Sequence, residues 1–334
     1  MKVLALGGYG TFGRTVARNL SSHEIVTEIV IAGRDLGAAR EFAEELGSKA
    51  RAVRVDASDE GALASLATGM DLLVNTAGPD YIVSFPAAKA AIRAGTHYCD
   101  LCADCDATER LLRFDADARS KGVTVLLGMG ASPGETNLLM KHAASQLDEV
   151  EDLRLLITYN LFGMIHHMGV ENPAEAALEM RRTGKVNASW ETVMKWGGGR
   201  VTVFENGELK DVDPSEHLER ITLPGKGSAV FFPIGCPEAI TIPRFLKNVC
   251  SASYMMNVAP PLVNDIYLSI ADRIRRKQID TREATILFHE EVGAKKAGES
   301  APSSWLLPGT SITAVATGSR HGSRVSSSCS PAME

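Results

Sequence analysis

The stretch KVLALGGYGTFGRTVARNL, residues 2–20, decides the fold. A short apolar run ends in glycines, and a helix is expected from Gly13 onward. Gly8, Gly10 and Gly13 form a G-x-G-x-x-G pattern between strand and helix. There the first glycine permits a tight turn, the second lets the backbone approach a pyrophosphate, and the third lets the helix pack close to the strand. The pattern predicts a dinucleotide site at the helix N-terminus.

Strand-like and helical segments continue to alternate up to about residue 135. Continuous apolar strands separated by amphipathic helices are typical of a parallel sheet covered on both faces. We therefore expect an α/β fold in which residues 1–135 form a Rossmann-type doubly wound NAD(P)-binding domain. The expected strands after the first lie at 24–33, 51–57, 70–78, 96–101 and 122–128, with one helix at 106–120 before the last of them.

Residues 136–334 follow a different pattern. Hairpin-linked strands followed by helices predict an α+β domain with a mostly antiparallel sheet, which suits a substrate and dimerisation role. Asn206-Gly207 predicts the turn of one hairpin, and residues 320–323 predict the turn of another. The expected elements are strands at 150–160, 229–235 and 238–243, a hairpin at 200–212, and helices near 260–277 and 280–296.

Composition narrows the class of protein. The chain has 334 residues, a formal net charge of −6 and no long basic run, so nucleic acid is not an expected partner. It contains no apolar stretch of about 18 residues and no signal-peptide pattern. We expect a cytoplasmic protein without a membrane partner.

Three cysteines, Cys99, Cys102 and Cys105, lie close together in a C-x2-C-x2-C pattern. An iron–sulfur run needs a fourth cysteine, but position 109 is Glu109. The other cysteines are isolated, so no metal site is expected. We expect Cys99 to be a buried strand residue, and the other two to lie in a loop at the rim of the active site.

The end of the second strand bears on the choice of cofactor. It reads Gly33-Arg34-Asp35. A small residue followed by arginine suits a 2′-phosphate, which Arg34 would hold through its planar fork, and this favours NADP. Asp35 is the counter-argument, because a carboxylate facing the ribose would favour NAD.

Other strand ends add cofactor candidates. Asp56 follows the third strand and either meets the adenine end or belongs to the N-cap region of the next helix. The segment NTAGP, residues 75–79, ends the fourth strand on small residues that let a cofactor pass closely. The residues predicted to bind the cofactor from these turns are Gly8, Gly10, Thr11, Phe12, Gly13, Arg34, Asp35, Asp56, Ala57, Thr76, Ala77, Gly78 and Pro79.

Several segments together resemble the saccharopine dehydrogenase-like oxidoreductases, which include saccharopine reductase, lysine 6-dehydrogenase and carboxynorspermidine dehydrogenase. The glycine loop alone would fit many dehydrogenases. HYCDL, residues 97–101, and GASPGETN, residues 130–137, narrow the resemblance to this family. The resemblance covers most of residues 1–145 and scattered parts beyond.

The resemblance implies an NAD(P)-dependent enzyme of amino-acid metabolism that transfers a hydride at a C–N centre. It would reduce an imine or oxidise an amine of an amino-acid or amine substrate. Relatives place Pro133-Gly134 near the nicotinamide and Asp100 toward the substrate cleft. Asp100 is the first candidate for the acid–base group, and His166 or His167 the second, with exposed loop histidines as the alternative.

Two alternatives stay open. One is an NADP-binding redox sensor without turnover, and the other is a C=O or C=C reductase on the same scaffold. Neither Tyr81 nor Tyr98 has a lysine four residues on, which disfavours the Tyr-x-x-x-Lys mechanism. The family pattern predicts more chain beyond Glu334, so we expect a C-terminal shortening, natural or by truncation. A homodimer through the second domain's sheet is also expected.

Overall fold

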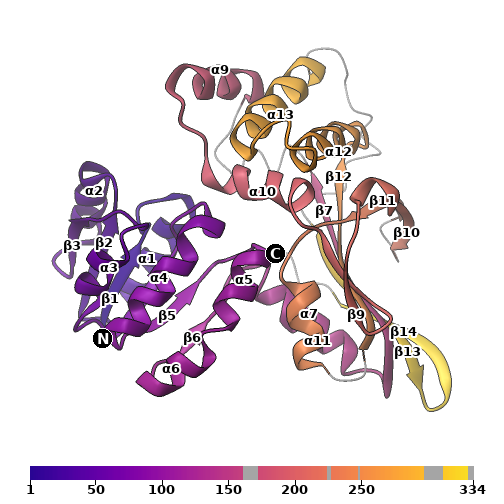
Figure 1. Cartoon of the computed structure of the whole chain (residues 1–334), viewed down its shortest axis with the longest axis horizontal. Coiled ribbons are helices and arrows are strands. Elements are labelled where there is room, and N and C mark those ends of the chain that lie inside the picture. Colours follow the sequence, from indigo (N-terminus) through magenta and orange to yellow (C-terminus); the bar gives the residue numbers. More distant parts are fainter. Residues whose placement is uncertain (161–171, 224–226, 247–248, 297–310, 330–334) are drawn as a thin grey trace. The chain divides into compact units, whose positions relative to one another are not determined.

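The structure is a computed structural model that describes residues 1–160, 172–223, 227–246, 249–296 and 311–329. The chain divides into two compact units, Met1–Pro133 and Gly134–Glu334. In Figure 1 the first unit is coloured indigo to magenta, and the second continues to yellow. Among the described residues, no helix is long and apolar enough to cross a membrane.

The N-terminal unit is built on a parallel six-stranded sheet in the order β3-β2-β1-β4-β5-β6. The order reverses between β1 and β4, and ligands of open α/β sheets bind outside the carboxyl ends of the strands at such a switch point. The expected doubly wound parallel sheet is confirmed. Its strands are β1 (Lys2–Leu6), β2 (Glu28–Gly33), β3 (Ala50–Arg54), β4 (Leu72–Asn75), β5 (His97–Asp100) and β6 (Val125–Leu126).

Helices cover both faces of this sheet (Figure 1). Neighbouring strand residues point to opposite faces, so Leu4 belongs to one buried apolar cluster and Val3 to another. Phe42 completes the second cluster from the helix that follows β2. The helices are α1 (Thr11–Ser22), α2 (Leu36–Leu46), α3 (Glu60–Ala67), α4 (Asp80–Ala94), α5 (Cys105–Leu112) and α6 (Asp115–Lys121).

The C-terminal unit is built on a mixed sheet. Its strands follow the order β10-β11-β12-β7-β13-β14, and β8 pairs with β12 while β9 pairs with β8. β12 and β7 pair in parallel, and the other described pairs are antiparallel. The mostly antiparallel character predicted from the hairpins is therefore confirmed. The strands are β7 (Glu149–Asn160), β8 (Thr202–Glu205), β9 (Glu208–Asp211), β10 (Glu219–Leu223), β11 (Gly227–Pro233), β12 (Val249–Ala259), β13 (Ser311–Arg320) and β14 (Ser323–Cys329).

The helices of this unit form two groups. In Figure 1, α9, α10, α12 and α13 pack together, while α7 and α11 lie along the sheet. In the first group, α10, α12 and α13 share a buried aromatic cluster that includes Trp190, Tyr267 and Phe288. The helices are α7 (Glu135–Ala144), α9 (Pro173–Thr183), α10 (Ala188–Gly198), α11 (Glu238–Phe245), α12 (Leu262–Arg275), α13 (Thr281–Lys296) and the short 3-10 helix η1 (Pro214–Glu216).

The bounds of several strands differ from the expected ones, and three expected elements differ more clearly. The strand expected at 238–243 is wrong, because this segment forms α11 and buries Glu238, Ile240 and Ile242 on the unit's core, and burial overrides the strand preference of isoleucine. The helix expected at 106–120 is two helices, α5 and α6. The sixth strand is shorter than expected, because the chain turns into a loop after β6.

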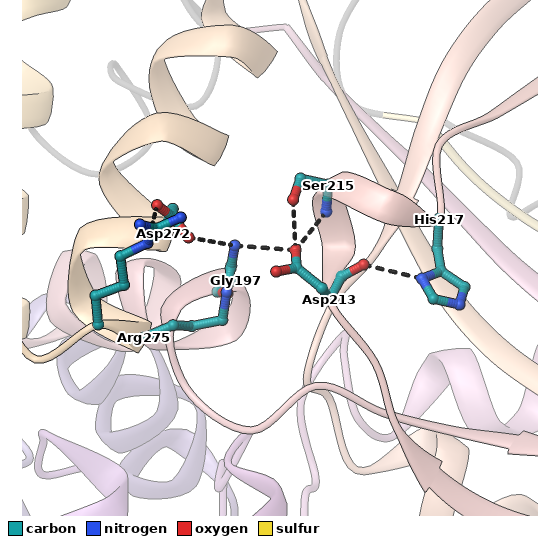
Figure 2. A network of polar contacts seen from close by, with 7 residues as sticks. Gly197, Asp213, Ser215, His217, Asp272 and Arg275 are labelled. Carbon is teal, nitrogen blue, oxygen red and sulfur yellow. Dashed lines mark hydrogen bonds and ion pairs between the residues drawn. The ribbon is translucent and has the colours of Figure 1, made fainter.

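A polar network ties α10 and α12 to the segment before η1 (Figure 2). The Arg275 side chain is 16% exposed. It donates to the Gly197 carbonyl oxygen at 2.8 Å and to Asp213 Oδ1 at 3.0 Å. Asp213 Oδ1 also accepts from the Ser215 N–H at 2.9 Å, and its carbonyl oxygen lies 2.9 Å from His217 Nδ1. Arg275 thus joins three segments that are distant in sequence.

Replacing Arg275 with alanine is expected to lower the free energy of unfolding by about 2–3 kcal/mol, because a helix-end carbonyl and a half-buried carboxylate lose their charged donor. Arg276→Ala is the matched control. Its guanidinium is 67% exposed and pairs with Asp272 at 2.7 Å, so its loss should cost under about 1 kcal/mol. Urea unfolding measures both, and equal losses would contradict the role given to Arg275.

Candidate active site

The glycine loop joins β1 to α1 at the carboxyl edge of the parallel sheet. Gly7 has a φ of +73°, and a Cβ there would lie 2.5 Å from the Ala77 nitrogen. Gly10 precedes the first residue of α1 and donates its N–H to the Gly7 carbonyl oxygen at 2.9 Å. A Cβ on Gly13 would overlap that same oxygen. The loop therefore presses α1 against β1 and the end of β4.

The tight turn belongs to Gly7, which the sequence pattern did not single out. The role was expected at Gly8, but Gly8 lacks a positive φ and donates its N–H to the Ala5 carbonyl oxygen at 3.2 Å. The spacing that matters for the backbone is Gly7-x-x-Gly10-x-x-Gly13. The signal was present in the sequence, since Gly7 is the residue directly after the strand.

Gly13→Ala is expected to weaken NADPH binding at least about tenfold, because the added methyl group forces the helix away from the loop that would hold the pyrophosphate. Its Cβ would also lie 2.7 Å from Thr76 Oγ1. Gly61→Ala in α3 is the control, since a Cβ there meets only Asp59 Oδ1 at 3.4 Å. A fluorescence titration of both variants with NADPH checks this, and unchanged affinity in Gly13→Ala would contradict it.

The residues after β2 contact the glycine loop. The Asp35 N–H donates to the Tyr9 hydroxyl at 3.0 Å. A Cβ on Gly33 would lie 2.5 Å from that hydroxyl, so the Tyr9 ring rests on Gly33. The Asp35 carboxylate accepts from the Ala38 N–H at 3.0 Å and caps α2. Asp35, which was considered as a ribose ligand, therefore uses its carboxylate to cap a helix.

Arg34 is exposed, and within the described part of the chain its guanidinium forms no hydrogen bond or ion pair. Its neighbour Asp56 accepts from the Ser58 N–H at 2.9 Å and hydroxyl at 2.7 Å. These two bonds, and the charge of Arg34, lower the pKa of the Asp56 carboxyl. Asp59 caps α3 by accepting from the Ala62 N–H at 2.9 Å, so Asp56 is not the N-cap.

Small residues follow β4 beside the glycine loop. Thr76 Oγ1 donates to the Leu6 carbonyl oxygen at 3.0 Å, and the Ala77 N–H donates to Asn75 Oδ1 at 3.1 Å. These bonds fix the start of the segment that ends in Gly78 and Pro79. The predicted cofactor residues of the turns after β1, β2, β3 and β4 thus share one edge of the sheet.

Asp100, the last residue of β5, is at the centre of a buried network. Its side chain is 1% exposed. Oδ1 accepts from the N–H groups of Gly128 at 2.8 Å and Cys102 at 3.2 Å, and Oδ2 accepts from the Tyr98 hydroxyl at 2.9 Å. Asn75 Nδ2 donates to the Tyr98 oxygen at 3.2 Å. Burial raises the pKa of the Asp100 carboxyl to about 6, although its three donors lower it in part.

This network fixes the loop that follows β6. The Met129 N–H donates to the Asp100 carbonyl oxygen at 2.7 Å, and the Gly130 N–H donates to that of Pro133 at 2.9 Å. The Pro133 ring packs on Gly128, where an added Cβ would lie 3.0 Å from the proline Cβ. The carboxylate of Asp100 is turned into the unit and holds this loop.

The remaining predicted site residues are two histidines and Gly134. His166 and His167 lie outside the described residues. Gly134 begins the C-terminal unit, where its N–H donates to Asn137 Oδ1 at 3.1 Å. Among the described residues, no group of three or more His, Cys, Asp or Glu side chains is placed to hold a metal ion.

The expectations for the three cysteines are confirmed only in part. Cys99 is only half-buried, because its strand is paired on one side with the two-residue β6. Cys102 lies in the loop after β5, as expected, whereas Cys105 is the first residue of α5. Both side chains are buried. The Thr108 hydroxyl lies 3.9 Å from Cys102 Sγ, and burial raises the pKa of this thiol well above its usual range. These thiols are part of the core.

Comparisons with known proteins bear on this site. Residues 3–126 match the family model described as saccharopine dehydrogenase NADP binding domain. The fold is similar to apo histidine-tagged saccharopine dehydrogenase (L-Glu forming) from Saccharomyces cerevisiae, with a TM-score of 0.62 and 13% identity over 99% of this chain and 84% of that chain. GenD2 from gentamicin A biosynthesis, in complex with NAD, aligns with a TM-score of 0.44 and 14% identity over 99% of this chain and 72% of that chain.

The family match spans the turns after β1, β2, β3, β4 and β5, which carry most of the candidate site. It confirms the resemblance and the choice of NADP, and the yeast structure confirms the fold. The match over residues 3–126 to a saccharopine dehydrogenase NADP-binding domain therefore supports an oxidoreductase with NADP as its cofactor.

Proposed function

We propose that this oxidoreductase transfers a hydride between NADP(H) and the carbon of a C–N bond in an amino-acid-like or amine substrate. In one direction it reduces an imine, and in the other it oxidises an amine. Residues 1–135 would bind NADP, and residues 136–334 would bind the substrate. The observation that carries this proposal is the family match over the turns of the candidate site, together with a yeast neighbour that is named a saccharopine dehydrogenase.

NADP fits the groups at the carboxyl edge of the sheet. The close approach of Gly7 and Gly13 brings the first-turn N–H groups of α1 to the loop, which suits a pyrophosphate. Arg34 offers an exposed cation for the 2′-phosphate. When bound, the reduced cofactor supplies the hydride, and the protein supplies binding, orientation and electrostatics.

We propose a positioning role for Asp100 in this reaction. Its Oδ1 accepts from the Gly128 N–H and its carbonyl oxygen accepts from the Met129 N–H, and these two bonds hold the loop whose last residue in this unit is the cofactor candidate Pro133. As the hydride adds to the imine carbon, the π electrons of the C=N bond move to nitrogen, which takes up a proton. Because an imine nitrogen is protonated easily, a strong dedicated acid is not required, and His166 or His167 stay the candidates for that proton.

We also propose that the protein is a cytoplasmic homodimer that pairs through the sheet of its C-terminal unit. Two-fold pairing of identical surfaces is the commonest arrangement of soluble homo-oligomers, and the eight-stranded sheet of this unit offers a continuous surface for it. Sedimentation at micromolar concentration should give the mass of two chains, and a monomer mass would count against the dimer.

The reaction class is tested by following NADPH absorbance with pairs of an amino acid and an oxo acid or aldehyde. Ketones alone and enoyl compounds are the comparison substrates. We expect NADPH oxidation only when amine and carbonyl partner are both present. Oxidation with the carbonyl compound alone would indicate a C=O reductase, and oxidation with enoyl compounds a C=C reductase. Tight NADPH binding without any turnover would indicate a redox sensor.

A further inference from the structure

We propose that Tyr9 reads the 2′-phosphate of NADP together with Arg34 and so sets the preference for NADP over NAD. The sequence pattern treated position 9 as a variable residue of the glycine loop. The inference rests on NADP as the cofactor and not on the C–N reaction proposed above.

The Tyr9 side chain lies at the end of β2. Its ring lies on Gly33, where an added Cβ would come within 2.5 Å of the hydroxyl and 2.6 Å of Cε1. The hydroxyl meets the Asp35 N–H at 3.0 Å. Both contacts are with the end of β2, where a Rossmann domain holds the adenosine ribose. Tyr9 thus extends from the phosphate loop to the 2′ position, beside Arg34.

The hydrogen-bonding capacity of this hydroxyl carries the second step. A phenol has one O–H donor and can accept as well. The Asp35 N–H uses the acceptor side, and within the described residues the Tyr9 hydroxyl has no acceptor for its own proton. The Asp35 carboxylate is engaged as the cap of α2. A phosphate would therefore receive two donors, the Tyr9 O–H and the Arg34 guanidinium.

The main chain of Tyr9 is held in place by Arg14. Arg14 Nε donates to the Tyr9 carbonyl oxygen at 3.2 Å. Arg14 in turn pairs with Glu45 at 3.2 Å and lies 4.5 Å from the centre of the Phe42 ring. Tyr9 is held at its main chain and at its hydroxyl, so little freedom is lost when a phosphate binds. Through the Asp35 N–H, the same hydroxyl also fixes the turn that presents Arg34.

The test is Tyr9→Phe in the full chain, titrated with NADPH, NADH, 2′,5′-ADP and 5′-AMP. The change removes one oxygen and leaves a ring on Gly33. We expect the Kd values of NADPH and 2′,5′-ADP to rise about tenfold, because a hydrogen bond to a charged group is lost. Those of NADH and 5′-AMP should stay within about twofold.

Gly33→Ala is the second variant, because its methyl group displaces the Tyr9 ring without altering the hydroxyl. It should show the same selective loss for the two ligands that carry a 2′-phosphate. Equal weakening of NADPH and NADH in Tyr9→Phe would overturn the proposal by showing that Tyr9 only packs the loop. Unchanged NADPH affinity would also overturn it. Because the readout is binding, a failure of the amine and oxo acid assay would refute the C–N reaction without affecting this result.

Discussion

Arg34→Ala is expected to weaken NADPH binding about a hundredfold and to leave NADH binding within about twofold. The guanidinium is exposed, and it forms no hydrogen bond or ion pair with a described residue that a phosphate would have to displace. A planar fork that binds a phosphate through two charged hydrogen bonds makes a larger contribution than a single neutral bond. Titration by nicotinamide fluorescence measures both affinities.

The control removes one positive charge elsewhere in the same unit. Arg119 of α6 pairs with Asp115 at 2.9 Å, and both side chains are mostly exposed. The helix α6 comes between β5 and β6, which lie on the other side of β1 from β2. Arg119→Ala should leave both affinities unchanged. If Arg34→Ala weakens NADPH and NADH alike, the 2′-phosphate role of Arg34 is wrong.

Asp100→Ala is expected to lower the free energy of unfolding by about 3 kcal/mol, because it leaves buried N–H groups without an acceptor. Asp100→Asn is the matched variant, since its amide oxygen can still accept from Gly128 and Cys102. Its amide nitrogen would face the Tyr98 hydroxyl, which lies 3.3 Å from the Ser84 carbonyl oxygen and can donate there instead. We expect Asp100→Asn to be at least as stable as the wild type at neutral pH.

The pH dependence of stability distinguishes the titratable carboxyl of Asp100 from the neutral amide of Asp100→Asn. Burial raises the pKa of Asp100 from 3.8 to about 6 on folding. The folded state therefore binds more protons than the unfolded state between these values, and the contribution of Asp100 to stability falls as the pH rises. The difference in unfolding free energy between wild type and Asp100→Asn should shift by about 2 kcal/mol against the wild type from pH 4 to 7. A constant difference would contradict the buried carboxylate.

Turnover distinguishes positioning from acid–base chemistry at Asp100. If Asp100 only positions the loop, Asp100→Asn keeps the hydrogen bonds to Gly128 and Cys102, and its turnover should stay within about tenfold of the wild type. A loss of about a thousandfold in Asp100→Asn, at unchanged NADPH affinity, would restore Asp100 as the proton donor or acceptor.

The sequence predicted the parallel sheet well, because strand and helix periodicities alternate and the glycine loop follows the first strand. It predicted the hairpin at Asn206-Gly207 for a similar local reason: the pair favours the left-handed backbone, and both residues have positive φ. It failed at α11, where a β-branched run is helical because the surrounding core buries it. Local preference could not reveal that contact, since the neighbouring β12 lies further along the chain.

In the candidate site, too, local sequence predicted some features, while contacts between distant residues decided the others. Arg34 could be chosen as a cofactor residue from the sequence because it directly follows a strand. The role of Asp35 could not, because it depends on α2 beginning at the next residue, which makes Asp35 its N-cap. Asp100 was expected to face the substrate cleft because the family resemblance places it there. Its burial arises from Gly128, 28 residues on, folding back onto it. Tyr9 was missed, although a ring in the loop and a glycine at the end of β2 form a complementary pair.

The most direct test of the C–N reaction follows the transferred hydride. The enzyme would be supplied with NADPH deuterated at C4 of the nicotinamide and with the amine and oxo acid pair that shows turnover. Mass spectrometry and NMR would then locate the label in the product. We expect deuterium on the carbon that bears the new C–N bond. Deuterium on a carbinol carbon, or on a carbon of a reduced alkene, would contradict the reaction.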